Sequence, residues 1–160
     1  MGEPINRRDM LHGASAVIGM AQVASAHAQE RKEADLKVVD FHNHYVGPSF
    51  KITAPTNTPQ QQAVVGNMGS ATALLNSLET TGVAARVVNT PTAFLEDADG
   101  NIPADLIPKI NDDLATLTVK NKGKVYSLAT VDAFSGDIGA REVQRAAKEL
   151  GLRGIFIESA

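Results

Sequence analysis

The chain of 160 residues contains no cysteine and no tryptophan, and aromatic residues make up only 4% of it. The absence of cysteine excludes disulfides and thiolate metal ligands, so any metal ion would be held by histidine, aspartate, glutamate or a modified side chain. Basic residues form no run beyond isolated pairs and the formal net charge is -3, which gives no indication of a surface for nucleic acid or anionic membrane. Hydrophobic residues make up 43%, which favours one modest domain with a core over a disordered chain.

The first thirty residues have the pattern of an export signal. An arginine pair precedes a weakly apolar run from residue 11 to residue 26, and the run ends in Ala26-His27-Ala28. This order of features is typical of a cleaved signal peptide, and the paired arginines resemble a twin-arginine signal. The run is too short and too polar for a stable membrane span. We expect a twin-arginine-type signal peptide over 1–28, a linker over 29–35 and an exported or periplasmic protein; the alternative is an ordinary N-terminal helix.

Two histidines lie one residue apart at the end of the first apolar segment. The sequence Val-Val-Asp-Phe predicts a buried strand over about 37–44, which ends in His42 and His44. Side chains two residues apart in a strand point to the same face, so we expect Asp40, His42 and His44 on one face. Two imidazoles about 6–7 Å apart at Cα can converge on one metal ion. The alternative is a pair of polar strand-end residues hydrogen-bonded to loop backbone, and Asp40 either orients a histidine or forms a turn.

Apolar periodicity predicts alternating helices and strands in the rest of the chain. Alternation of this kind favours a parallel sheet with right-handed crossovers. A long loop with one helical turn near 60–65 is expected over 45–69. The later elements are a helix from Ser70 to Gly82, a strand over 83–89, a helix over 103–122, a strand over 124–130, a helix capped by Asp137 that buries Val143, Ala146, Ala147 and Leu150, and a strand over 152–158.

Two other kinds of site lack support in the sequence. No strand is followed by a glycine-rich phosphate-binding motif, so a nucleotide-binding sheet is not indicated. The Asp97-x-Asp99-Gly100 sequence lacks the later glutamate of a calcium loop, which favours a solvated turn.

The histidine segment also resembles a known family. Asp40-Phe41-His42-Asn43-His44 is similar to the Asp-x-His-x-His signature of the amidohydrolase superfamily, at the end of the first barrel strand. The stretches 111–114, 123–130 and 148–155 resemble its family 2 branch, which includes aminocarboxymuconate-semialdehyde decarboxylases and related aromatic-acid decarboxylases and hydrolases. The resemblance covers about residue 36 to the end of the chain.

This resemblance implies a fold and a partial metal site. The fold class would be α/β, the N-terminal half of a (β/α)8 TIM-barrel-like metal-dependent hydrolase, with about four βα units over 36–160. His42 and His44 would be two ligands of one divalent metal ion, usually zinc. The remaining family ligands, a histidine from strand five and an aspartate from strand eight, have no counterpart here. We therefore expect a truncated chain or a fragment.

Other strand-end side chains are candidates for contact with a small-molecule substrate. In a barrel, Asn89, Thr90, Asp132 and Glu158 would lie around the same mouth as the histidines. Glu158 is a candidate substrate contact because some superfamily members place a bridging acid or carbamylated lysine on strand four. Asp132 is a second candidate substrate contact, or a turn and cap residue.

We expect a metal-dependent hydrolase or carboxy-lyase that acts on a small organic acid, ester, lactone or amide. The alternatives are a catalytically inactive half-barrel remnant and a metal-free α/β binding domain. Unpaired strand edges of a half-barrel would permit pairing with a second copy, so a homo-oligomer is a further expectation.

Overall fold

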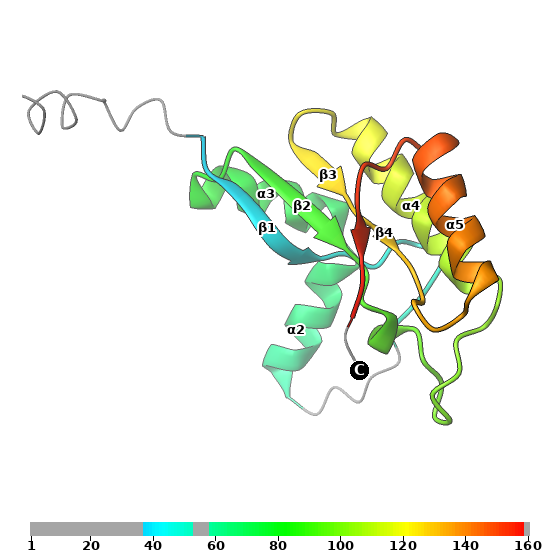
Figure 1. Cartoon of the computed structure of the whole chain (residues 1–160). Helices are drawn as coiled ribbons and strands as arrows, with labels where there is room; N and C mark the ends of the chain where they lie inside the picture. Colours follow the sequence, from blue (N-terminus) through cyan, green and yellow to red (C-terminus); the bar gives the residue numbers. More distant parts are fainter. Residues whose placement is uncertain (1–36, 53–57, 159–160) are drawn as a thin grey trace, which may run out of the picture. The chain divides into compact units, whose positions relative to one another are not determined.

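The computed structural model describes residues 37–52 and 58–158, so the predicted signal peptide and linker lie outside the described residues. Parallel strands alternate with helices along the chain (Figure 1). The elements are, in order, β1 (Val39–His44), α2 (Pro59–Met68), α3 (Ala71–Thr81), β2 (Ala85–Asn89), the 3-10 helix η2 (Thr92–Phe94), α4 (Leu106–Lys120), β3 (Val125–Ser127), β4 (Ala129–Thr130), α5 (Asp137–Lys148) and β5 (Ile155–Phe156).

The strands form two parallel groups, β1-β2-β3 and β4-β5. The strand predicted over 124–130 is divided between them, since β3 pairs with β2 and β4 pairs with β5. The Leu128 N–H, between the two, donates to the Val88 carbonyl at 2.9 Å, and the Ala129 N–H donates to the Gly154 carbonyl at 2.9 Å. One extended segment therefore exchanges its hydrogen-bond partner halfway along, and each regular strand is shorter than predicted.

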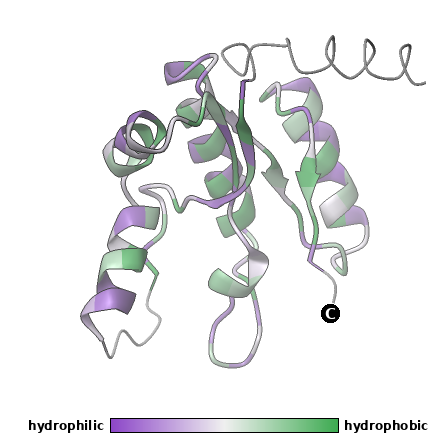
Figure 2. Ribbon diagram, turned by 90° about the vertical axis from the view of Figure 1, so that its left-hand side faces the viewer, coloured by the Kyte–Doolittle hydropathy of each residue, from purple (hydrophilic) through white to green (hydrophobic). Residues whose placement is uncertain are grey.

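Helix α4 supplies much of the core through the apolar stripe that its sequence predicts. Ile110, Leu114 and Leu117 are buried against Val88 of β2 and Val125 of β3. Full burial of each such side chain contributes about 1.5–3 kcal/mol. Figure 2 shows hydrophobic and hydrophilic residues alternating along the helices. The stripe therefore places α4 along the face of the sheet that carries Val88.

The long loop predicted after the first strand contains a complete helix, α2, rather than a single turn. The hydroxyl of Thr58 accepts from the Gln61 N–H at 3.2 Å, and the Gln61 side chain accepts from the Thr58 N–H at 3.1 Å. This is a capping box, followed by proline in the first turn. Helix α2 has no buried residue, so apolar periodicity could not reveal it. The Thr-Pro-Gln-Gln sequence was the available signal.

Helix α5 differs from the prediction in its cap and in its buried face. The N-cap is Gly136, at φ 58°, and Asp137 is the first helical residue without a capping role. Ala147 is exposed, whereas Glu142 is buried. Burial of this carboxylate is possible because Arg145 donates to both of its oxygens at 2.9 Å. The buried face of α5 thus includes a charged residue, Glu142, which the apolar pattern did not predict.

The first strand is an exposed edge, so the prediction that it is buried is wrong. Val38 is 56% exposed and Phe41 is 72% exposed. Among the described residues, β1 pairs with β2 alone and β5 pairs with β4 alone. The apolar side chains at these two edges therefore lack a covering strand in the part of the chain that the structure describes.

Candidate metal centre

A β-bulge interrupts β1 immediately before the two histidines. Asp40 is paired with Arg86, and Asn43 is paired with Val88. Three steps along β1 thus match two steps along β2, which places one extra residue on β1. A bulge of this kind bends the strand and breaks the alternation of its side chains.

The bulge separates Asp40 from His44, although the sequence predicts a common face. Asp40 lies beside Arg86, whereas His44 is paired with Asn89. Residues 86 and 88 share a face of β2, and Val88 packs among the helix side chains, so Arg86 is on the helix side and Asn89 is on the other. The predicted common face of Asp40, His42 and His44 is therefore wrong, because one inserted residue inverts the pattern.

The imidazoles of His42 and His44 nevertheless lie together. Their ring centroids are 4.9 Å apart and their planes are inclined by 69°. Both rings line a pocket of about 510 Å³ that also includes Arg86 and residues of α2 and α3. The structure thus places the two predicted ligands side by side at the carboxyl end of β1.

Asn89 holds the ring of His44. The Nδ1 atom of His44 is 2.9 Å from Oδ1 of Asn89, and Asn89 is only 1% exposed. Because a carboxamide oxygen only accepts, this contact favours the tautomer with the proton on Nδ1. The Nε2 atom is then the nitrogen able to coordinate a metal ion, as is common for metal-binding histidines.

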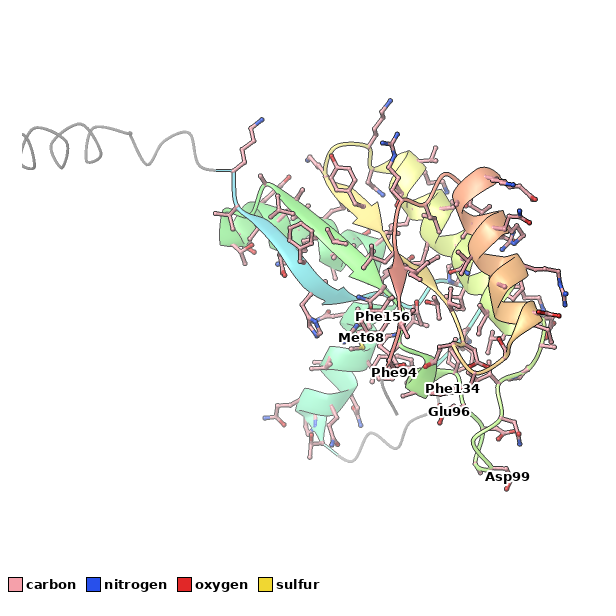
Figure 3. All side chains as sticks on the ribbon, viewed as in Figure 1. Met68, Phe94, Glu96, Asp99, Phe134 and Phe156 are labelled. Carbon is pink, nitrogen blue, oxygen red and sulfur yellow. The ribbon has the colours of Figure 1, made fainter. Side chains whose placement is uncertain are left out.

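Two phenylalanines form an aromatic wall beside His44. The ring of Phe94, from η2, is 5.7 Å from the His44 ring, and that of Phe156, from β5, is 6.3 Å away. Both contacts are edge-to-face, a favoured arrangement of aromatic rings. Figure 3 labels the two side chains near the ends of their elements.

Glu158 is attached to η2. Its Oε2 atom accepts from the Thr92 hydroxyl and from the Ala93 N–H, the latter at 3.1 Å. Desolvation raises the pKa of Glu158, but these hydrogen bonds and the nearby His44 outweigh it and leave the pKa below its ordinary value. Glu158 is therefore an ionised group close enough to His44 to interact electrostatically with it.

Asp132 forms a turn at the end of β4. Its Oδ1 atom accepts from the Phe134 N–H at 2.9 Å, and its carbonyl accepts from the Ser135 hydroxyl at 2.7 Å. Asp132 and Glu158 line a common pocket of about 540 Å³. None of the described residues lines both this pocket and the pocket of the histidines. The structure thus brings the two candidate substrate contacts together in one pocket, and Glu158 also interacts electrostatically with His44.

The donor set fits part of a metal site. Within the described ranges, no group of three or more histidine, aspartate or glutamate side chains could hold a metal ion. A catalytic zinc ion has three protein ligands and an open position. His42 and His44 provide two imidazole nitrogens of the expected kind, so further ligands would complete the site.

Sequence reasoning missed the roles of three consecutive residues of α4. Asn111 exchanges hydrogen bonds with the backbone of Thr130, at 2.8 and 3.0 Å. Asp112 pairs with Arg145 at 2.7 Å. Asp113 accepts from the backbone N–H of Ser49 at 2.8 Å. Three adjacent side chains thus connect α4 to β4, to α5 and to the loop that follows His44.

Among the residues that the structure describes, none of the helices combines the length and the apolar character needed to cross a bilayer.

No protein-family model matches the sequence, and no curated protein matches it. Solved structures do match the fold. A 5-carboxyvanillate decarboxylase from Sphingomonas paucimobilis is 20% identical with a TM-score of 0.63, over 79% of this chain and 44% of that one. The corresponding enzyme from Novosphingobium aromaticivorans, solved with manganese and 4-hydroxy-3-methoxy-5-nitrobenzoic acid, is 18% identical with a TM-score of 0.66, over 80% and 43% of the two chains. A 2,6-dihydroxybenzoate decarboxylase from Rhizobium is 17% identical with a TM-score of 0.61, over 77% and 38%.

These similarities confirm the predicted fold class, an α/β partial barrel of the TIM type. They also confirm, at the level of the fold, the resemblance to amidohydrolases and to the decarboxylases grouped with them. The chain spans about two fifths of the length of the solved structures it matches.

Proposed function

We propose that this chain contributes His42 and His44 to the divalent-metal centre of a carboxy-lyase that acts on a small aromatic acid. The observation that carries the proposal is the pair of imidazoles, 4.9 Å apart at the carboxyl end of the first strand of a partial barrel. Active sites of TIM barrels lie at this end of the strands.

The residues around the pair support the choice of an aromatic substrate. Phe94 and Phe156 present ring edges and faces next to His44. An aromatic acid bound beside the metal would bury its ring against such a wall. Three of the structural neighbours described above are named as decarboxylases of aromatic acids.

The metal would polarise a bound oxygen of the substrate and stabilise negative charge that develops on it. His42 and His44 would hold the ion through one nitrogen each. The contribution of Asn89 is to keep the Nδ1 proton of His44 in place, so that Nε2 stays available. The resemblance implies zinc, whereas neighbouring structures were solved with manganese; elemental analysis of the protein decides between them.

Hydrolysis is the second candidate, because the structural neighbours also include a protein described as an amidohydrolase. The same two histidines would then hold the metal, and the substrate would be an ester, lactone or amide. The two proposals share the site and differ in the product.

The test begins with the coding DNA beyond residue 160. If the reading frame continues into further βα units with histidine and aspartate at strand ends, the complete protein is purified and incubated with hydroxybenzoic acids and with esters, lactones and amides. Release of CO2 that is lost in His42→Ala supports the carboxy-lyase. Hydrolysis without CO2 release supports the second candidate. If the metal-loaded protein catalyses neither reaction, both candidates are contradicted.

We also propose that residues 1–28 direct export by the twin-arginine route, on the basis of the arginine pair, the apolar run and Ala26-His27-Ala28. Replacement of both arginines by lysine should retain the full-length precursor in the cytoplasm. Equal periplasmic yields of the two forms would contradict the proposal.

A further inference from the structure

Three side chains form a hydrogen-bonded group across the β1 bulge. The Asn43 Nδ2 atom donates to Oδ2 of Asp40, and Arg86 Nη1 donates to Oδ1 of Asn43 at 3.1 Å. Arg86 Nε also lies 3.7 Å from the same Asp40 oxygen. We call this group, Asp40, Asn43 and Arg86, the bulge clasp.

The bulge clasp also holds the backbone at the first histidine. The other carboxylate oxygen of Asp40 accepts from the backbone N–H of His42 at 3.0 Å. A bulge leaves a backbone group without its ladder partner, and such a group needs another acceptor. Asp40 supplies one, so its carboxylate binds the backbone of one histidine while Arg86 of β2 holds it from the other side.

Arg86 is unusually buried for a residue of this kind. Its side chain is 12% exposed, and Nε is the one buried side-chain nitrogen or oxygen atom without a hydrogen-bond partner among the described residues. An incompletely satisfied buried guanidinium is costly for stability. Its position beside the bulge, next to the histidine pair, therefore indicates a role in local geometry more than in stabilising the fold.

We infer that the bulge clasp positions His42 and His44 for a shared metal ion. In a regular strand the two histidines would share a face with Asp40, whereas the bulge puts His44 in register with Asn89, on the face opposite to Arg86. The clasp holds β1 in its bulged form. In this form the N–H of His42 donates to Asp40, the ring of His44 is bonded to Asn89, and the two imidazole rings lie 4.9 Å apart. The three residues are positioning residues, and none of them is a predicted metal ligand. The inference rests on the proposed metal-binding role of the histidines.

The test compares Arg86→Met and Asn43→Ala with Thr80→Ala in the full chain. Thr80 lines the same pocket, but its hydroxyl donates to carbonyls of its own helix, those of Asn76 and Ser77, so this variant is the matched control. The first measurement uses the metal-free protein and records NMR cross-relaxation between the ring protons of His42 and His44. The second measures the affinity for Zn²⁺ alone by calorimetry.

Both clasp variants should lose the cross-relaxation between the rings and bind Zn²⁺ about 10–100-fold more weakly, as is typical for residues that orient metal ligands. Thr80→Ala should resemble the wild type, and Arg86→Lys should recover part of the affinity. Unchanged cross-relaxation and affinity in folded Arg86→Met or Asn43→Ala would overturn the inference. If Arg86→Met does not fold, Asn43→Ala alone decides. If Zn²⁺ affinity is instead unchanged in His42→Ala, the proposed metal site fails, and the ring cross-relaxation still tests the clasp.

Discussion

His44 is bonded through Nδ1 to Oδ1 of Asn89, a buried residue at the end of the neighbouring strand, at 2.9 Å. This contact joins the last residues of β1 and β2 and leaves the Nε2 atom of the ring for coordination. The first prediction follows from it.

Asn89→Ala should weaken metal binding without removing a ligand. Loss of the acceptor lets the His44 ring rotate and change tautomer, so metal affinity should fall about 10-fold or more. Nitrogen NMR of the imidazole reports the tautomer, and titration with Zn²⁺ reports the affinity. Asn89→Asp keeps an oxygen acceptor and serves as the control. A tautomer and an affinity that are both unchanged in Asn89→Ala would show that Asn89 does not orient the ring.

Glu158 should stabilise the fold in a pH-dependent manner. Its pKa is lowered in the folded protein, so its contribution is present above the ordinary glutamate value of 4.5 and is lost as the pH falls through the lower, folded value. Glu158→Gln should therefore be less stable than the wild type at pH 7, and the difference should shrink in acid. Chemical unfolding at a series of pH values measures it. A difference that stays constant with pH would exclude this linkage.

Two adjacent residues of α4 should differ strongly in their contribution to stability. Asn111 is fully buried and bonded to the backbone of Thr130 and to Glu142, so Asn111→Ala should cost about 3 kcal/mol. Asp112 forms an ion pair while its side chain is 56% exposed, so Asp112→Ala should cost no more than about 1 kcal/mol. Denaturant unfolding of both variants tests the contrast. Equal losses would contradict the roles assigned to the two side chains.

Substitution of two glycines by alanine should have opposite effects. A Cβ at Gly47 would lie 2.3 Å from a carboxylate oxygen of Asp113, the group that binds the Ser49 N–H. Gly47→Ala should therefore destabilise the protein by about 1–3 kcal/mol. Gly66 lies in α2 with open space around its Cβ position, so Gly66→Ala should stabilise by about 0.5–1 kcal/mol. Thermal unfolding measures both shifts, and a stabilised Gly47→Ala would contradict the packing described here.

The sequence predicted those parts of the fold that depend on apolar periodicity. The stripe of Ile110, Leu114 and Leu117 located α4, and Ser70 and Gly82 marked the ends of α3, where the structure has an N-cap and a left-handed C-cap. These signals are local, because each comes from residues within one helix.

The features that sequence reasoning missed depend on contacts between distant residues or on polar signals. The bulge in β1 arises from pairing with β2, and Arg86 is 46 positions after the Asp40 that it faces in the ladder. Nothing in the residues 40–44 alone indicates an insertion in the ladder. Helix α2 buries no residue, so its capping box was the only sequence signal that could predict it.

The sequence predicted only part of the candidate site, because the rest depends on contacts between residues that are distant in the sequence. The spacing of His42 and His44 indicated a shared ligand role, and the structure places their rings together. Glu158 and Asp132 line a pocket of their own, where η2 binds Glu158 through Thr92 and Ala93, and Glu158 is still close enough to His44 to interact with it electrostatically; their contact with a substrate stays a prediction. The ligand assignments themselves remain predictions.

The most direct test of the central claim is the metal affinity of the purified full chain. Zn²⁺ and Mn²⁺ binding is measured by calorimetry for the wild type, His42→Ala, His44→Ala and Asp99→Ala, the last being an exposed acidic residue of a distant turn. We predict that each histidine variant loses binding, whereas Asp99→Ala binds as the wild type does. Binding that persists unchanged in both histidine variants would contradict the metal centre.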